Sequence, residues 1–156
     1  MKHLKHLLRQ PLQKVPNSIA IFLIVIALIG FVDAGYLTVE HFQGKIPPCT
    51  ISGGCEVVLT SPYSVILGIP VSLAGVIYYL LILVGVSAFL ESKNLSILKW
   101  TMLFTAFGLG ASLWFVYIQV FTLHSYCQYC LVSAFTSIIL FATSMEVIKK
   151  YQIKQL

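Results

Sequence analysis

The sequence predicts an all-α integral membrane protein built as a four-transmembrane-helix bundle, and three observations lead to this fold class. Hydrophobic residues occupy 58% of the 156 positions and charged residues only 10%, whereas charged residues form about a quarter of a typical soluble domain. Four apolar windows are long enough to cross a membrane, which takes about 20 helical residues. Basic residues gather on one side of these windows, as they do on the cytoplasmic side of multi-pass proteins.

The four windows occupy most of the chain. The first contains Asp33 as its only interior charge, and the second contains none. Short connections join the windows, so we expect one membrane domain over residues 18–148, with a basic leader at 1–17 and a basic tail at 149–156. The predicted spans are residues 18–40, 71–90, 100–121 and 127–147.

The first window has a competing interpretation as a secretory signal peptide, because a basic leader precedes an apolar stretch. We favour a span, since the apolar run is long enough to cross the membrane and no small-x-small cleavage site follows it. The chain is therefore expected to cross the membrane four times.

Orientation follows from the basic residues. Nine of the ten Lys and Arg residues precede the first span, lie between the second and third, or follow the fourth, and Lys45 alone lies on the other side. The positive-inside rule then places both termini of this cell (cytoplasmic) membrane protein in the cytoplasm. The formal charge of +5 is explained by a basic surface beside anionic lipid, so no nucleic-acid partner is expected.

All four cysteines fall on the predicted extracytoplasmic side. Cys49 and Cys55 lie in the connection 43–70, and Cys127 and Cys130 form a C-x-x-C pair at the start of the fourth span. Because this side is an oxidising compartment, the thiols are expected to form pairs. Three interpretations are open: structural disulfides that pin the loop, a four-cysteine metal site, or redox exchange.

The spacing favours redox exchange. A C-x-x-C disulfide closes a very small loop and stabilises little as a structural link. An oxidising compartment works against thiolate metal ligands, and we predict no metal site. Ser125 and Gln128 have the spacing of a capping box, which would start the helix at about Tyr126 and put Cys127 and Cys130 near its N-terminus. A helix N-terminus lowers the pKa of a thiol, and residues three apart share a helix face.

A dithiol that accepts electrons at a membrane surface needs an acceptor. The sequence contains no nucleotide-binding fingerprint and no histidine pair spaced to hold haem within the bundle, so we expect a quinone, bound in an apolar pocket with one or two hydrogen-bond donors. The candidate pocket walls are the aromatic residues nearest this end: Trp114, Tyr117, Tyr126, Tyr129 and Phe135.

The whole chain resembles the vitamin K epoxide reductase family, in its bacterial quinone-linked branch without a fused thioredoxin-like domain. The resemblance rests on "CTISGGCEVVLTSPYSVILGIPVSLAG" followed by "YCQYC" and covers about residues 18–148. It implies a membrane thiol-disulfide oxidoreductase that reoxidises an extracytoplasmic thioredoxin-fold (DsbA-like) partner. The electrons would pass to ubiquinone or menaquinone, in support of disulfide formation in secreted proteins.

The resemblance also implies residue roles. Cys130 matches the cysteine that faces and reduces the quinone, and Ser61 matches a hydroxyl that approaches the quinone head group. Cys127 matches the cysteine that exchanges with Cys55 of the loop. Cys49 matches the cysteine that meets the thioredoxin-fold partner. These matches imply the pairs Cys49–Cys55 and Cys127–Cys130.

The family pattern further implies a short amphipathic surface helix between Cys55 and Pro62, in the first extracytoplasmic loop. Two positions depart from the epoxide-reducing members, because Pro62 replaces an asparagine and Ala134 replaces a tyrosine. We therefore expect plain quinone reduction. The alternative is a non-enzymatic membrane protein with structural disulfides or a cysteine metal site. Asp33 is open to two roles, a proton relay or a structural hydrogen bond, because a carboxylate in a span should face the bundle interior.

Overall fold

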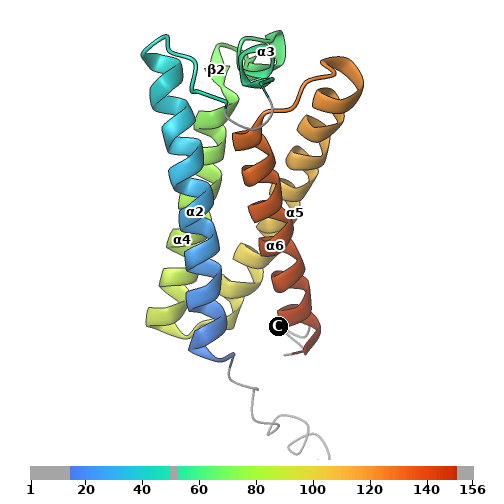
Figure 1. Ribbon diagram of the computed structural model, residues 1–156. Helices are drawn as coiled ribbons and strands as arrows, with labels where there is room; N and C mark the ends of the chain where they lie inside the picture. Colours follow the sequence, from blue (N-terminus) through green and yellow to red (C-terminus); the bar gives the residue numbers. More distant parts are fainter. Residues whose placement is uncertain (1–14, 50–52, 151–156) are drawn as a thin grey trace, which may run out of the picture.

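The computed structural model describes residues 15–49 and 53–150, so most of the predicted leader and the end of the tail lie outside the described residues. Four long helices dominate the described part: α2 (Asn17–Phe42), α4 (Val71–Ser92), α5 (Leu95–Tyr117) and α6 (Gln128–Lys150). They form a ring in which α2 and α5 each contact both α4 and α6 (Figure 1). Each is long and apolar enough to cross a membrane, α5 together with the turn that follows it. This confirms the predicted all-α four-helix membrane bundle.

The connection between α4 and α5 shows how polar residues set helix ends. Lys93 ends α4 with a left-handed φ of 52°, a conformation that stops a helix. Asn94 then caps α5, because its Oδ1 accepts a hydrogen bond from the backbone N–H of Ser96 at 2.9 Å. The helix therefore starts at Leu95, ahead of the apolar stretch that begins near Trp100.

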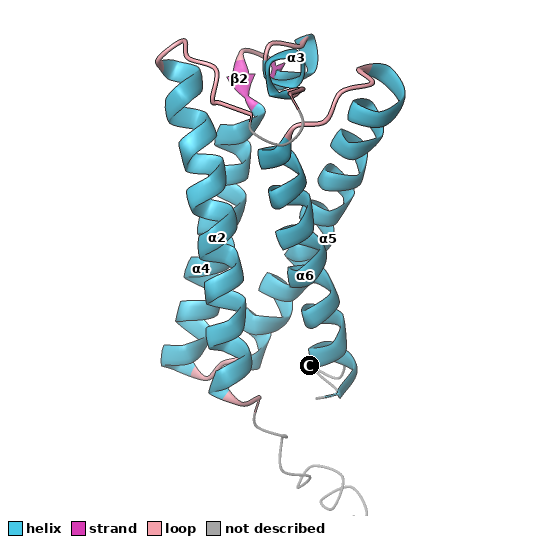
Figure 2. Ribbon diagram, in the orientation of Figure 1, coloured by secondary structure: helices cyan, strands magenta, loops and turns pink. Residues whose placement is uncertain are grey.

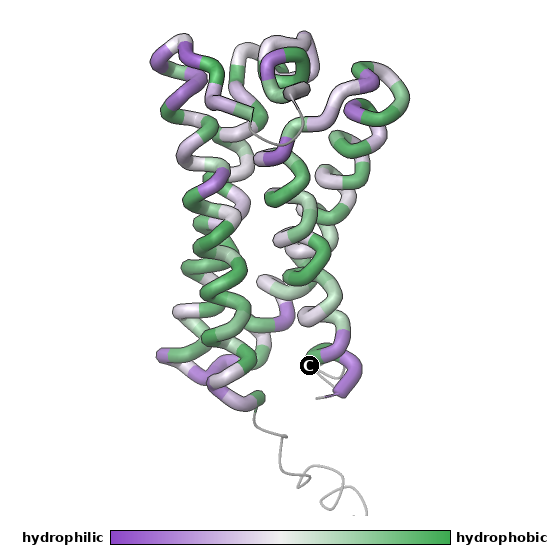
Figure 3. Tube along the Cα trace, viewed as in Figure 1, coloured by the Kyte–Doolittle hydropathy of each residue, from purple (hydrophilic) through white to green (hydrophobic). Residues whose placement is uncertain are grey.

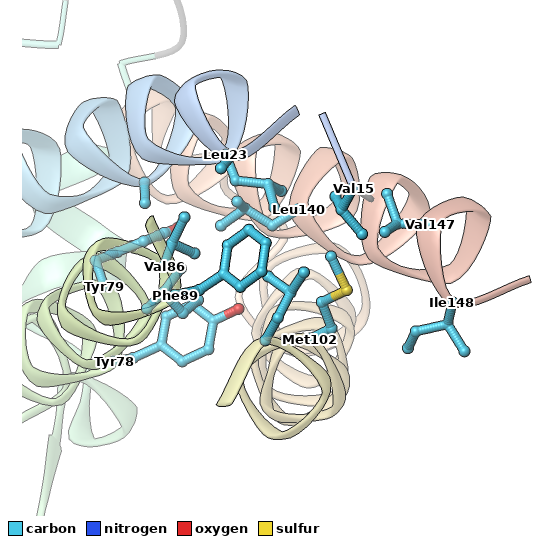
Figure 4. Close-up of a cluster of buried hydrophobic side chains, with 14 of the residues drawn as sticks. Val15, Leu23, Tyr78, Tyr79, Val86, Phe89, Met102, Leu140, Val147 and Ile148 are labelled. Carbon is cyan, nitrogen blue, oxygen red and sulfur yellow. The ribbon is translucent and has the colours of Figure 1, made fainter. Parts of the chain in front are cut away.

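Apolar contacts between the four long helices, together with hydrogen bonds of one buried hydroxyl, hold the interior of the bundle together. Apolar side chains from α2, α4, α5 and α6 form the main cluster, part of which is drawn in Figure 4. Within it, the ring of Tyr79 lies against Gly30 of α2, where any side chain would collide with it. Its hydroxyl lies 2.7 Å from Thr136 Oγ1 and donates to the Ser133 carbonyl at 2.9 Å. Tyr79 thus links α4 to α2 and α6 through contacts that satisfy its polar atom.

The outer surface of the bundle matches a lipid environment. Hydrophobic residues dominate the middle of the four helices, and hydrophilic residues gather toward the two ends (Figure 3). Large apolar side chains point outward, including Val32, Phe121 and Phe135, each more than 60% exposed. Helices that are apolar on every face suit a membrane, where lipid covers the outward side chains.

The connection between α2 and α4 closes one end of the bundle. It contains α3 (Cys55–Leu59), the turn η1 (Pro62–Ser64), and the strands β1 (Val65–Ile66) and β2 (Ile69–Pro70). The strands pair antiparallel, Val65 opposite Pro70. Figures 1 and 2 show α3 lying across this end, above the long helices. The predicted short surface helix is confirmed, and the hairpin is an addition that the sequence had not predicted.

Candidate functional site

All four cysteines meet at the end of the bundle that carries α3. Cys55 and Cys127 have no exposed surface and pack with Val58 in one apolar cluster, against which Cys49 and Cys130 also pack. They come from the connection after α2, the first residue of α3, and the start of α6. The structure therefore brings together the four residues that the sequence singled out, here called the cysteine cluster.

The two pairs of this cluster are in different redox states. Cys49 and Cys55 form a disulfide with their Cα atoms 5.8 Å apart. Cys127 and Cys130 are thiols. The Cys49–Cys55 disulfide implied by the family resemblance is present. The two cysteines at the start of α6, Cys127 and Cys130, are here called the helix pair, and they are not bonded to each other.

Cys127 occupies the N-cap of α6. The helix begins at Gln128, two positions after the predicted start, and the carbonyl of Cys127 accepts the first intrahelical bond, from Leu131 N–H at 3.0 Å. Its Sγ accepts a hydrogen bond from the backbone N–H of Cys130 at 3.5 Å. A sulfur at the N-cap thus takes the place that a Ser or Asp oxygen usually fills. Helix amides point at this sulfur and favour negative charge on it.

The thiol of Cys127 is the more acidic member of the pair. A hydrogen bond from the Cys130 thiol, together with backbone N–H groups of Cys130 and Tyr129, lowers the pKa of Cys127 to about 7, although burial opposes the change. When the reduced pair loses a proton, the thiolate therefore forms on Cys127. The thiolate is the reactive form of cysteine, so the pair is prepared for exchange.

A glycine lets the two cysteine-bearing segments touch. Gly54, the N-cap of α3, lies where a Cβ atom would be 2.7 Å from the backbone N and O of Tyr126. Any larger residue would push the two backbones apart. Because Gly54 precedes Cys55 and Tyr126 precedes Cys127, this contact holds the two buried cysteines in one cluster.

Tyr129 ties the Cys49 segment to α6. Its hydroxyl donates to the carbonyl of Pro48 at 3.1 Å, and its ring lies 5.5 Å from that of Tyr36. Since Pro48 precedes Cys49 in the chain, this hydrogen bond limits the freedom of the first cysteine. Tyr129, which the sequence proposed as a pocket wall, serves this contact instead.

A cavity of about 1060 Å³ lies beneath the loop, with walls from all four long helices. Its lining is mostly apolar, and it includes Cys130 and Ser61 but neither Cys127 nor Cys55. The helix pair is thus divided, because Cys130 lines the cavity whereas Cys127 is sealed beside the loop disulfide. The volume is slightly above the usual range of about 300–1,000 Å³ for small-molecule sites.

The aromatic walls differ from those the sequence proposed. Of the five candidates, Trp114 lines the cavity and the other four do not. Phe135, for example, is 64% exposed on the outer face of α6. Aromatic lining comes instead from the loop and from α4 and α5: Tyr63, Tyr78, Tyr79, Phe107 and Phe115.

Ser61 is buried at the roof of the cavity. It is 9% exposed, and its hydroxyl donates to the carbonyl of Val58 at 2.7 Å. The lone pairs of the oxygen stay available, so in this rotamer Ser61 can accept a hydrogen bond but not donate one to a bound molecule. The structure therefore puts Ser61 and Cys130 on the same cavity.

Three buried polar atoms of residues that line this cavity have no hydrogen-bond partner: Asp33 Oδ2, Tyr78 Oη and Gln119 Nε2. Unpaired buried polar groups are costly and rare in folded proteins. An apolar cavity with a free donor, a free acceptor and a thiol fits a flat ring that carries oxygens. The sequence identified Asp33 as unusual within a span but overlooked Gln119, although an amide in a span is the same kind of signal.

These observations define a class: multi-pass membrane proteins that hold two cysteine pairs at one end of a four-helix bundle, beside an apolar cavity. The chain belongs to the vitamin K epoxide reductase family, whose family model matches residues 21–145. It is also similar to "Thiol-disulfide oxidoreductase LTO1" of Arabidopsis thaliana, with 39% identity over 132 residues. That match covers 79% of this chain and 35% of the relative, so the chain spans about a third of the relative's length. Both descriptions name oxidoreductases, and the resemblance noted from the cysteine motifs is confirmed.

Proposed function

We propose that the chain is a quinone-linked thiol-disulfide oxidoreductase that reoxidises a thioredoxin-fold (DsbA-like) partner on the extracytoplasmic side of the cell membrane. One observation carries the proposal: Cys127 packs with Cys55, whereas Cys130 lines the cavity. A dithiol arranged in this way has one sulfur toward a disulfide and the other toward a bound molecule. The thiol-disulfide description of the relative supports the same chemistry.

The first exchange enters through Cys49. Cys55 has no exposed surface, whereas Cys49 is partly exposed. A thiolate of the reduced partner attacks Cys49, the bond to Cys55 breaks, and Cys55 leaves as a thiolate. The second thiol of the partner then displaces Cys49, so the partner leaves oxidised and both loop cysteines are reduced.

The second exchange passes between the pairs. The Cys55 thiolate attacks Cys127 in the oxidised helix pair, and Cys130 is released. Cys49 then attacks Cys55, restores the loop disulfide and expels Cys127. A thiol with a lowered pKa leaves faster, so the environment of Cys127 favours this step.

The cavity completes the cycle. Ubiquinone or menaquinone bound there supplies an acceptor for two electrons and two protons. Cys127 and Cys130 lose those electrons and protons and return to the disulfide. Ser61 accepts a hydrogen bond at the roof of the cavity, and Asp33 is a carboxylate on the same cavity that can take up or release a proton. Ala134 lines the cavity without a hydroxyl, which favours plain quinone over an epoxide as substrate.

The proposed orientation has the cysteine cluster outside and both termini inside. Among the described residues, basic side chains gather at the opposite end of the bundle: Lys93, Lys99, Lys149 and Lys150. Such residues favour the cytoplasmic side. The partner would then meet Cys49 in an oxidising compartment. The membrane domain is proposed to extend over residues 18–148.

The test is quinone reduction by the purified protein in detergent, driven either by a reduced thioredoxin-fold protein or by a small dithiol. Cys130→Ala should abolish turnover with both reductants. Cys49→Ala should abolish turnover with the protein reductant and retain part of it with the small dithiol, which can reduce the helix pair directly. Turnover that survives Cys130→Ala would overturn the proposal. It would favour the alternative of structural disulfides, which would stay oxidised in mild thiol buffer.

A further inference from the structure

Gln119 is a polar side chain in the interior of an apolar bundle, and the relay described above gives it no role. It is 2% exposed and lies on the cavity that Cys130 lines. It belongs to η2 (Ile118–Thr122), a π-helical turn that continues α5 and is closed by a bond from Leu123 N–H to the Ile118 carbonyl at 2.9 Å. A π turn inserts one extra residue and so changes the direction of the side chains within it, often at functional positions.

One end of the Gln119 amide is assigned by its partner. The backbone N–H of Cys127 donates to it at 2.9 Å, so this atom is Oε1. The backbone carbonyl of Gln119 also accepts from Ser125 N–H at 3.1 Å. A single residue of η2 thus holds the segment that leads into the N-cap cysteine of α6.

The other end of the amide is the unpartnered Nε2. An amide nitrogen carries two N–H donors and cannot accept. Because Cys127 fixes Oε1, the side chain cannot rotate to give Nε2 a new partner without losing that bond. The remaining way to satisfy Nε2 is an acceptor within the cavity.

We propose that Gln119 binds a carbonyl oxygen of the cavity ligand through Nε2 while its Oε1 positions Cys127. The ligand class is a cyclic diketone, and this identification rests on the proposed function. One rigid amide then connects the ligand to the thiolate-bearing cysteine. Ligand binding therefore fixes the amide plane, and the amide plane fixes the backbone at Cys127.

Ligand binding is measured without turnover, on oxidised protein in detergent. The chain has two tryptophans. Trp114 lines the cavity and Trp100 is 71% exposed, so Trp100→Phe leaves a single reporter. A short-chain ubiquinone is titrated, and quenching of Trp114 gives the affinity. Gln119→Leu should weaken this affinity by about tenfold, the usual effect of losing one buried hydrogen bond.

A second readout separates binding from general loosening of the fold. In a Cys130→Ser background, Cys127 attacks Cys55, Cys49 leaves as a thiolate, and the new Cys55–Cys127 disulfide accumulates at a measurable rate. Gln119→Leu should slow this reaction as well as weaken quinone binding. Gln119→Glu keeps an acceptor for the Cys127 N–H but lacks the donor when ionised, so it should weaken quinone binding and leave the disulfide rate near that of the parent.

Thr105→Val is the matched control, because Thr105 is a buried polar residue of α5 that donates to Met102 and does not line the cavity. Thr105→Val should change neither the quinone affinity nor the rate of Cys55–Cys127 disulfide formation. Equal quinone affinity in the parent and Gln119→Leu would overturn the role of Gln119 and leave the proposed function standing. A parent that shows no saturable quenching would overturn both. If Gln119→Glu lowered both the quinone affinity and the rate of Cys55–Cys127 disulfide formation, Gln119 would have a structural role alone. That result would overturn the proposal that its amide binds the ligand and positions Cys127 at the same time.

Discussion

Polar side chains in two regions of the bundle interior have opposite surroundings. The hydroxyl of Tyr79 lies within hydrogen-bonding distance of Ser133 and Thr136, so its polar atom is satisfied by the protein. Near the cysteine cluster, Gln119 Nε2 and Asp33 Oδ2 have no partner. A membrane bundle is more stable when its buried polar atoms are hydrogen-bonded, as in Tyr79, because unpaired polar groups are costly away from water. Under the proposed function, a quinone in the cavity would complete the hydrogen bonding of the second arrangement.

The largest expected effect comes from separating the loop from α6. Gly54→Val would place a branched side chain against the backbone of Tyr126 and move Cys55 away from Cys127. Small displacements of reacting groups lower rates by about 100-fold, so we expect a loss of that size in the rate of the Cys55–Cys127 exchange. Rapid-quench alkylation and mass spectrometry would measure it. Gly44→Val, at a loop glycine with no neighbour within 4 Å, serves as a control for general strain, since its φ of 66° is also unfavourable for valine.

The comparison between satisfied and unsatisfied groups is tested by a pair of conservative changes. Tyr79→Phe should lower the free energy of unfolding by about 1–3 kcal/mol, because the hydroxyls on α6 lose their shared partner. Asp33→Asn should leave stability near that of the parent but lower quinone turnover by about 100-fold, the lower end of the range for loss of a proton-transfer group. Thermal unfolding in detergent and steady-state turnover distinguish the two. A stability loss in Asp33→Asn with unchanged turnover per folded molecule would assign Asp33 a structural role.

The pH dependence of exchange should report the hydrogen bond within the helix pair. Cys130→Ser keeps a donor beside Cys127, whereas Cys130→Ala removes it. Because that donor is the main cause of the lowered pKa, the rate of Cys55–Cys127 disulfide formation should rise through about pH 7 in the Ser variant. In the Ala variant the midpoint should shift upward by about one unit, toward the ordinary thiol pKa. Identical midpoints would mean that the helix amides alone lower the pKa.

The smallest effect is expected at the tether of the first cysteine. Tyr129→Phe removes the hydrogen bond to the carbonyl of Pro48 but keeps the ring beside Tyr36. Cys49 should then react with a thioredoxin-fold partner about threefold faster, because a neutral exposed hydrogen bond contributes less than about 1 kcal/mol. The rate of mixed-disulfide formation checks this. Tyr36→Phe is the matched control, since it leaves the Pro48 contact intact.

Much of this architecture could be predicted because membrane spans leave a strong apolar signal. The four cysteines were also identifiable, since their spacing and their predicted side of the membrane point to the same chemistry. Helix ends set by Asn94, and the hairpin with its two-residue strands, depend on local hydrogen bonds that hydropathy does not report. The cavity lining depended on helix rotation, which the π turn at Ile118–Thr122 changes. Gln119 was nevertheless detectable as an amide within a span, whereas the surface that Tyr129 reaches depends on the rotation of α6, which hydropathy does not report.

The burial of Cys55 and Cys127 has a consequence for selectivity in a crowded compartment. Neither sulfur has exposed surface, so a small thiol such as glutathione cannot intercept the mixed disulfide between them from the aqueous side. In the proposed relay, small thiols could then pass reducing equivalents to a quinone in the cavity only through Cys49. In that relay, a partner protein and small thiols would compete at Cys49 alone.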